Sequence, residues 1–135
     1  MAEHQAQQEA VAAPVTADAI LSLRNNPPRE PYTIPGVGIV QVYGLSNLEA
    51  RQWNEGCERT DGRITDPYAD AKMIVRCVRN DKGERIFTDK HVTQIVELPE
   101  LVVKGLIGKC MKLCGIGPEA DAEILKNFAA AVASS

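Results

Sequence analysis

The chain has 135 residues, of which 44% are hydrophobic and 24% are charged, and its formal net charge is −3 at pH 7. This composition is ordinary for a folded globular protein and excludes global disorder, and the length fits one domain with a sizeable core. The acidic balance offers no excess positive potential to a phosphate backbone or an anionic membrane. Neither nucleic acid nor a membrane is therefore an expected partner.

The N-terminal residues predict a flexible tail, 1–15, ahead of a single helical domain, 16–135. The first fourteen residues are rich in Ala, Gln and Glu and show no period that would pack a face against a core. They lack the basic and apolar regions of a secretory signal, and no stretch approaches the ~20 apolar residues that cross a bilayer. We therefore expect a cytoplasmic protein whose four cysteines are reduced and serve as small apolar core residues.

A short helix and a β-hairpin are expected next. Thr16 can cap a helix that carries Ile20, Leu21 and Leu23, and the prolines that follow Asn26 stop it. Two runs of β-branched and aromatic residues then flank a Pro-Gly-Val-Gly turn. They predict a β-hairpin near 32–43. The paired glycines of this turn resemble a phosphate loop only superficially, because a strand follows them instead of a helix N-terminus.

Ser46 and Glu49 match a capping box, in which each side chain satisfies a free N–H at a helix start. They predict a helix over 47–59, with Ala50, Trp53 and Cys57 on one face, followed by a loop over 60–63. Trp53 is the only tryptophan. It is interpreted as a core residue or, alternatively, as an interface anchor, since Trp is enriched at binding hot spots.

Three further helices are expected before residue 115. Asp66 as cap and Pro67 at the first helical position predict one helix that ends near Asn80, where 81–83 form a turn. Thr88 can cap another. The helix that begins at Pro67 has its apolar positions at Ala71, Ile74 and Val78. The helix that Thr88 caps has them at Val92, Ile95 and Val96.

Pro99 is expected to begin the central core helix, which Gly115 closes. Gly105 and Gly108 weaken this helix by ~1 kcal/mol each relative to Ala, so close approach of a neighbouring helix is the expected reason for them. Pro118 begins a last predicted helix that reaches about Val132. The apolar stripe of the central helix consists of Val103, Leu106, Ile107, Cys110, Leu113 and Cys114.

These elements predict a mainly α (α+β) fold, a compact bundle of about five or six helices with one N-terminal β-hairpin. In this prediction the hairpin near 32–43 is the only sheet structure.

Two patterns suggest metal binding. Cys110 and Cys114 lie one helical turn apart, and Cys57, Cys77 or His91 could complete a zinc site. Core packing is the better interpretation, because both thiols lie on the apolar stripe. The stretch 81–85 suggests calcium, but it lacks the further oxygen ligands of an EF-hand and is better explained as a turn.

His91 has no clear nucleophile beside it and is expected to be solvated or to cap a helix. Lys104, Lys109 and Lys112 form a basic run that is either a solvated helix face or a surface that steers an acidic partner. We predict no catalytic, cofactor-binding or metal-binding residues, no cofactor, and no enzymatic activity.

Four stretches, taken in order, resemble the tail assembly chaperones of long-tailed bacteriophages with non-contractile tails. The family pattern has an acidic-Gly turn followed by Phe-Thr-Asp, a helix with Glu-Leu-Pro, a long apolar helix ending in Leu-x-Gly, and a late Lys-Asn. The likeness covers roughly residues 16–128. The stretches are Arg76 to Asp89, Glu97-Leu-Pro99, Lys112-Leu-Cys-Gly115 and Lys126-Asn-Phe128.

The resemblance implies a non-catalytic protein made in the infected bacterium. Relatives bind the tape measure protein, keep it soluble while tail tube subunits polymerise around it, and leave before the virion is complete. Many relatives also have a longer, frameshifted form whose added part recruits the tail tube protein. We further expect weak, concentration-dependent or spiral self-association. The alternative is a structural component of the virion, such as a minor tail or head-tail joining protein.

Overall fold

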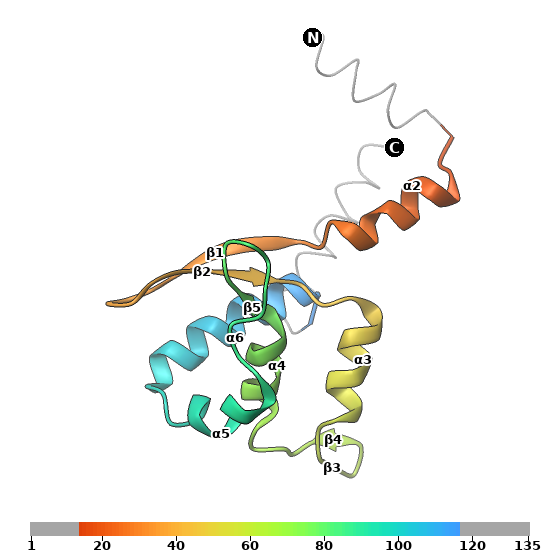
Figure 1. Cartoon of the computed structure of the whole chain (residues 1–135). Helices are drawn as coiled ribbons and strands as arrows, with labels where there is room; N and C mark the ends of the chain where they lie inside the picture. Colours follow the sequence, from red (N-terminus) through yellow and green to blue (C-terminus); the bar gives the residue numbers. More distant parts are fainter. Residues whose placement is uncertain (1–13, 117–135) are drawn as a thin grey trace, which may run out of the picture.

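The computed structural model describes residues 14–116, and a β-hairpin lies where the sequence predicts one (Figure 1). Strands β1 (Arg29–Ile34) and β2 (Gly38–Tyr43) pair antiparallel, in a register that runs from Arg29 opposite Tyr43 to Ile34 opposite Gly38. The turn needs glycine because Gly36 has φ +77° and Gly38 has φ +146°, values that other residues rarely adopt.

A third strand extends this hairpin into a sheet. The two-residue strand β5 (Val78–Arg79) pairs antiparallel with β2 and gives the order β1-β2-β5. The sequence predicts a helix that continues to about Asn80, but helix α4 (Ala69–Cys77) ends before this strand. Val78 is extended, with ψ 126°, because its backbone pairs with Val42 while its side chain is fully buried.

A second, two-stranded sheet replaces the loop expected over 60–63. Helix α3 (Asn47–Glu55) ends at Gly56, short of the predicted residue 59, and β3 (Arg59–Thr60) then pairs with β4 (Arg63–Ile64). The turn between them consists of Asp61, with φ 54°, and Gly62, with φ 78°. Asp-Gly with positive φ at both positions is the preferred sequence of a two-residue hairpin turn.

The prediction of a compact bundle of five or six helices with one β-hairpin is wrong. The described residues form an α+β structure, with five strands in two sheets and five α-helices. Two of the helices have only five residues or fewer. The error arises because β5 and the β3–β4 pair are two-residue strands, which are too short to show a period in the sequence.

Helix α4 is the centre of the core, whereas the sequence assigned that place to the long apolar helix. Five of its nine residues are buried: Ala71, Met73, Ile74, Val75 and Cys77. Helix α6 (Glu100–Cys114) contacts α4, β1 and β2, but only its Leu106 and Cys110 are buried. The predicted end of α6 at Gly115 is confirmed, with φ +69° at this residue. Helix α6 is therefore one wall of a core centred on α4.

The segment between β5 and α6 is a turn followed by two short helical pieces. Gly83 has φ +80° in the turn predicted for 81–83, and the Asn80 side-chain oxygen accepts hydrogen bonds from the N–H groups of Lys82 and Glu84. The 3-10 helix η2 (Asp89–His91) and α5 (Val92–Ile95) follow. Ile95 is buried and anchors this segment to the core.

The first described element is helix α2 (Ala17–Leu21), which continues into the 3-10 helix η1 (Ser22–Asn25). The Thr16 side chain accepts a hydrogen bond from the N–H of Ala19, so the predicted cap is present. Neither element contains a buried residue, and α2 stands clear of the sheet and the other helices (Figure 1). Most of the predicted tail, and the predicted helix that begins at Pro118, lie outside the described residues.

Candidate functional site

Trp53 lines several hollows in the surface, two of which have volumes of about 410 Å³ and 500 Å³, and a hydrogen bond holds its indole in place. Helix α3 begins with the predicted capping box, in which the Ser46 Oγ accepts from the N–H of Glu49 and the Glu49 Oε1 accepts from the N–H of Ser46. One further turn along, the Trp53 indole is 7% exposed and its Nε1 donates to the carbonyl oxygen of Ala69 at 3.0 Å. The interpretation of Trp53 as a core residue is therefore confirmed, and its interpretation as an interface anchor stays a prediction, although the ring also lines both of these hollows.

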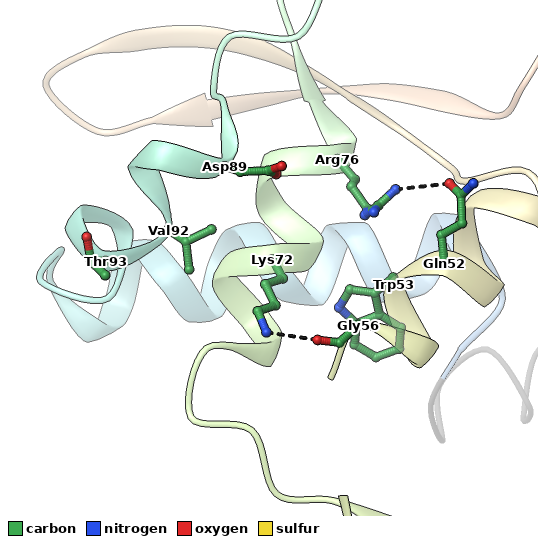
Figure 2. Close-up of a pocket in the computed structure, with 8 residues that line it drawn as sticks. All are labelled: Gln52, Trp53, Gly56, Lys72, Arg76, Asp89, Val92 and Thr93. Carbon is green, nitrogen blue, oxygen red and sulfur yellow. Dashed lines mark hydrogen bonds between the residues drawn. The ribbon is translucent and has the colours of Figure 1, made fainter. Parts of the chain in front are cut away.

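The first hollow is a cleft of about 410 Å³ with a mixed polar and apolar lining, which lies between α3 and α5 with α4 beneath it (Figure 2). Its apolar part comes from Trp53 and Val92, and polar groups surround them. We refer to this site as the Trp53 cleft. Its lining residues are Gln52, Trp53, Gly56, Lys72, Arg76, Asp89, Val92 and Thr93.

The cations of the Trp53 cleft differ in how firmly they are held. The Lys72 Nζ lies 2.5 Å from the buried Asp66 carboxylate and donates to the Gly56 carbonyl oxygen at 2.9 Å. The hydrogen bond from Lys72 lowers the pKa of Asp66, and the same bond raises the pKa of Lys72. Among the described residues, Arg76 has only a long contact, 3.5 Å from its Nη1 to the Gln52 Oε1. Arg76 is thus the cation that can turn toward a bound polar group.

The second hollow is an apolar groove of about 500 Å³ on the other side of Trp53. Its walls come from α3, β4 and the C-terminal end of α6. The Asp-Gly turn places Ile64 at its edge, where this side chain is 38% exposed. We refer to it as the apolar groove. Its lining residues are Ala50, Arg51, Trp53, Asn54, Ile64, Met111 and Ile116.

Apolar side chains also cover the surface of residues 14–25, which we call the arm. Ile20, Leu21 and Leu23 are 57%, 52% and 64% exposed, and Val15 is 74% exposed. The base of the arm lies against the body, where Leu23 lines a shallow hollow with Pro28 and the start of α3. Single exposed apolar residues are normal on a protein surface, but a contiguous set marks an interaction site.

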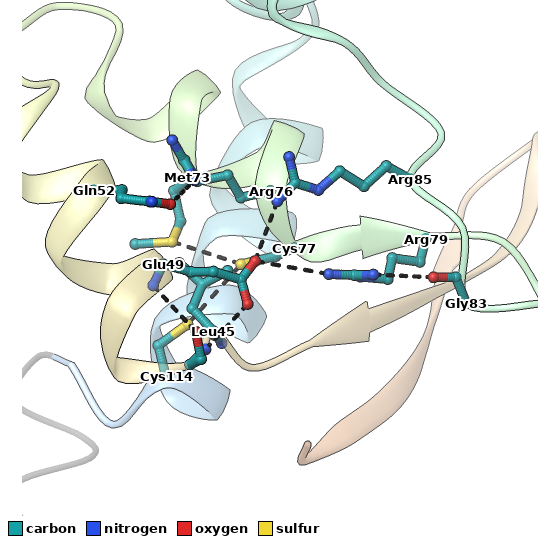
Figure 3. A network of polar contacts seen from close by, with 11 residues as sticks. Leu45, Glu49, Gln52, Met73, Arg76, Cys77, Arg79, Gly83, Arg85 and Cys114 are labelled. Atoms are coloured by element: carbon teal, nitrogen blue, oxygen red, sulfur yellow. Dashed lines mark hydrogen bonds and ion pairs between the residues drawn. The ribbon is translucent and has the colours of Figure 1, made fainter. Parts of the chain in front are cut away.

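The suggested zinc ligands are only partly brought together. The Cys77 Sγ lies 3.9 Å from the Cys114 Sγ, and the Cys114 Sγ accepts from the N–H of Leu45 at 3.3 Å (Figure 3). His91 lies elsewhere and its Nδ1 accepts from the N–H of Thr88, a capping role. Among residues 14–116, no group of three His, Cys, Asp or Glu side chains is placed to hold a metal ion.

The two close thiols are poor nucleophiles. Hydrogen bonding with Cys110, together with burial, raises the pKa of Cys77, and hydrogen bonding with Cys77, together with burial, raises the pKa of Cys114. The reactive form of cysteine is the thiolate, so both groups stay protonated and inert at neutral pH. They act as core residues at the contact between α4 and α6.

The stretch suggested as a calcium site is a structural turn tied to α3. The Arg79 Nη1 donates to the Gly83 carbonyl oxygen at 3.0 Å, and the Glu49 carboxylate lies 3.1 Å from the Arg85 Nη2 and 3.9 Å from Arg79 (Figure 3). Glu49 thereby joins the capping box of α3 to the turn after β5. Within residues 14–116 the stretch belongs to no group of three His, Cys, Asp or Glu side chains placed to hold a metal ion, whereas calcium requires several oxygen ligands.

The basic run of α6 is largely engaged in ion pairs with the hairpin. The Lys109 Nζ lies 2.6 Å from the Glu30 carboxylate of β1, and the Lys112 Nζ lies 3.9 Å from it. The hydrogen bond from Lys109 lowers the pKa of Glu30. Only Lys104 of this run has no ion pair within residues 14–116. The run is therefore not a free basic surface.

Sequence reasoning missed most of the apolar groove. Ala50 and Trp53 were identified as a helix face, but Ile64 fell between the predicted loop over 60–63 and the cap at Asp66, and neither Ile64 nor Met111 was singled out. The Asp-Gly pair at 61–62 was the available signal for the strand that carries Ile64.

Comparisons with protein-family models, with curated proteins and with solved structures found no match to this chain. In the part of the chain that the structure describes, no helix is long and apolar enough to span a membrane.

Proposed function

We propose that this protein is a phage tail assembly chaperone, which binds the tape measure protein in the cytoplasm of the infected bacterium and keeps it soluble while tail tube subunits assemble around it. The protein then leaves before the virion is complete. The tail tube protein is its second partner, recruited through a longer frameshifted form. The proposal begins from the resemblance of residues 76–89, 97–99, 112–115 and 126–128 to this family.

The observation that carries the proposal is the apolar surface that residues 14–116 leave uncovered. The arm exposes Ile20, Leu21 and Leu23, and the two hollows on either side of Trp53 are open. A protein that holds an aggregation-prone helical chain in solution must offer such surface, because amphipathic helices bind by placing their apolar face in a groove. The resemblance and the exposed apolar surface thus support the same function.

The Trp53 cleft is suited to a tape measure helix. Its apolar centre, Trp53 and Val92, can receive apolar side chains, and the surrounding Gln52, Arg76 and Asp89 can bond to polar side chains at the edge of the same helix. A mixed lining of this kind fits an amphipathic helix, which presents both types of side chain side by side. We assign the tape measure contact to this cleft.

Co-expression tests the proposal. The chain is produced together with the product of a very long neighbouring reading frame, and the soluble fraction is compared with that of the long protein expressed alone. We expect the tape measure protein to become soluble and to co-purify. Thr93→Arg, which crowds the cleft, should reduce co-purification, and Thr33→Arg on the exposed face of β1 is the matched control. Equal insolubility with and without the chain would disprove the function.

Mass spectrometry of purified particles separates the proposal from a structural role in the virion. A chaperone that leaves the assembly is absent from finished particles but present in lysates of infected cells. Stoichiometric presence in washed particles would favour a minor tail or head-tail joining protein instead.

A further inference from the structure

The arm is a helical segment without a buried residue within the described range 14–116. Helix α2 has five residues and none is buried. Isolated helices shorter than ~12 residues are marginal in water, and most helical stability in proteins comes from packing an apolar face. In the part of the chain that the structure describes, the three large apolar side chains of residues 20–23 are more than half exposed, although Leu23 lines the hollow at the base of the arm. The arm is therefore expected to be covered by another surface when it is ordered.

The apolar groove has the converse property, because no residue among 14–116 covers its apolar wall. Its volume of about 500 Å³ exceeds that of the Trp53 cleft, and its lining is predominantly apolar. Ala50, Ile64 and Met111 come from three different elements, so the groove is a fixed shape in the fold. It can receive two or three aliphatic side chains.

Charges at the two surfaces are complementary. Asp18 lies in the first turn of α2, two residues before Ile20, and Arg51 lies on the wall of the groove. Within residues 14–116 neither of these two side chains forms an ion pair. An arm placed in the groove can bring the Asp18 carboxylate to the Arg51 guanidinium, which favours one orientation of docking.

We propose that the arm of one copy docks in the apolar groove of a second copy. The arm points away from the body of its own chain and joins it at Pro27 and Pro28 (Figure 1), which favours contact with a neighbour. Each copy carries one arm and one groove, so the contact is head-to-tail and can build rings or open chains. This inference gives the expected self-association a defined surface, and it does not depend on the binding of a tape measure protein.

Sedimentation velocity of the purified full chain over a concentration series tests the proposal. The wild-type chain should shift from monomer to larger species as concentration rises. Two variants should stay monomeric at concentrations about tenfold higher: the arm variant Ile20→Asp/Leu21→Asp and the groove variant Ile64→Arg. Val37→Asp, at an 80% exposed position in the hairpin turn, is the control that should assemble as the wild type does.

Mixing the two variants distinguishes arm-to-groove contact from a general loss of stability. The arm variant keeps an intact groove and the groove variant keeps an intact arm, so an equal mixture should form dimers and no larger species. A chain that is monomeric at every concentration would overturn the proposal, as would variants that assemble like the wild type. The first result would also be expected if residues after Ile116 of the same chain filled the groove.

Charge reversal provides an independent measurement. Asp18→Arg alone and Arg51→Asp alone should each weaken assembly, whereas the chain that carries both changes should recover it. Loss without recovery would exclude the pairing of these residues and, with it, the proposed orientation. Because all these measurements use the purified chain, their failure leaves tape measure binding untouched, and failed co-expression leaves the arm-to-groove contact untouched.

Discussion

The Tyr32 ring occupies the space in which a side chain at Gly105 would lie. A Cβ atom at Gly105 would be 2.9 Å from the Tyr32 Cζ and closer still to its hydroxyl oxygen. This contact places β1 directly against α6. The sequence suggested that both glycines of α6 allow a neighbouring helix to approach, but the neighbour at Gly105 is a strand residue, and a Cβ at Gly108 would meet no atom within 4 Å.

We therefore expect opposite effects from two identical substitutions in α6. Gly108→Ala should stabilise the protein by up to about 1 kcal/mol, because alanine is the better helix former and nothing opposes it. Gly105→Ala should destabilise it by about 1 to 3 kcal/mol, because Tyr32 must leave its packed position. Urea unfolding monitored by the fluorescence of Trp53 measures both. In a Tyr32→Ala background, Gly105→Ala should become stabilising, and a penalty that persists there would contradict this explanation.

Gly44→Ala should be the most damaging of the glycine substitutions. A Cβ at Gly44 would lie 2.5 Å from the Leu113 carbonyl oxygen and 2.9 Å from the Pro28 Cγ. A backbone oxygen cannot move aside as a side chain can, so the end of α6 must shift away from the sheet. We expect a loss of about 3 kcal/mol or more in the free energy of unfolding. If thermal unfolding showed that Gly44→Ala destabilises the protein less than Gly105→Ala does, the close packing of α6 against Gly44 would be disproved.

The features that the sequence predicted well depend on local chemistry. The Ser46–Glu49 capping box, the hairpin turn at Gly36 and the stop at Gly115 each require particular hydrogen bonds or a positive φ within a few residues. Strand β5 could not be predicted in this way. Val78 continues the apolar period of α4, and only its pairing with β2, more than thirty residues earlier, makes it extended.

The candidate site was less predictable than the fold because it depends on which elements meet. Trp53 could be identified as important from its type and its helix face, but its two hollows are formed by residues of α4, α5, β4 and α6. For the arm, the sequence predicted the local structure but not the exposure of its side chains. Ile20 and Leu21 were correctly placed in a short helix, whereas Leu23 lies in the 3-10 helix that follows it. Their spacing could not reveal that these three side chains are exposed in the described part of the chain.

The cap of α3 and the ion pairs of Glu49 can be separated by two substitutions. Ser46→Ala removes the side-chain acceptor of the Glu49 N–H and should cost about 1 kcal/mol at any salt concentration. Glu49→Gln keeps an oxygen for the Ser46 N–H but removes the charge that faces Arg79 and Arg85. Its cost should be below about 1 kcal/mol and should shrink as salt is added. Urea unfolding at low and high salt measures both costs. If the cost of Ser46→Ala depended on salt, the separation of the helix cap from the ion pairs of Glu49 would be refuted.

The free energy of unfolding should decrease at acidic pH because Asp66 becomes protonated. The hydrogen bond from Lys72, with the N–H groups of Tyr68 and Glu58, lowers the pKa of Asp66 below its ordinary value of 3.8. A carboxyl group whose folded pKa is depressed contributes stability above its unfolded pKa, and this contribution is lost as the pH falls through the folded pKa. Asp66→Asn should destabilise the protein at neutral pH and should flatten the acid limb of its stability curve. Asp81→Asn, in the exposed turn after β5, should leave that limb unchanged. Denaturant midpoints measured across the acid range test this prediction. If stability fell equally steeply with pH in Asp66→Asn and in the wild type, the acid sensitivity would belong to other groups.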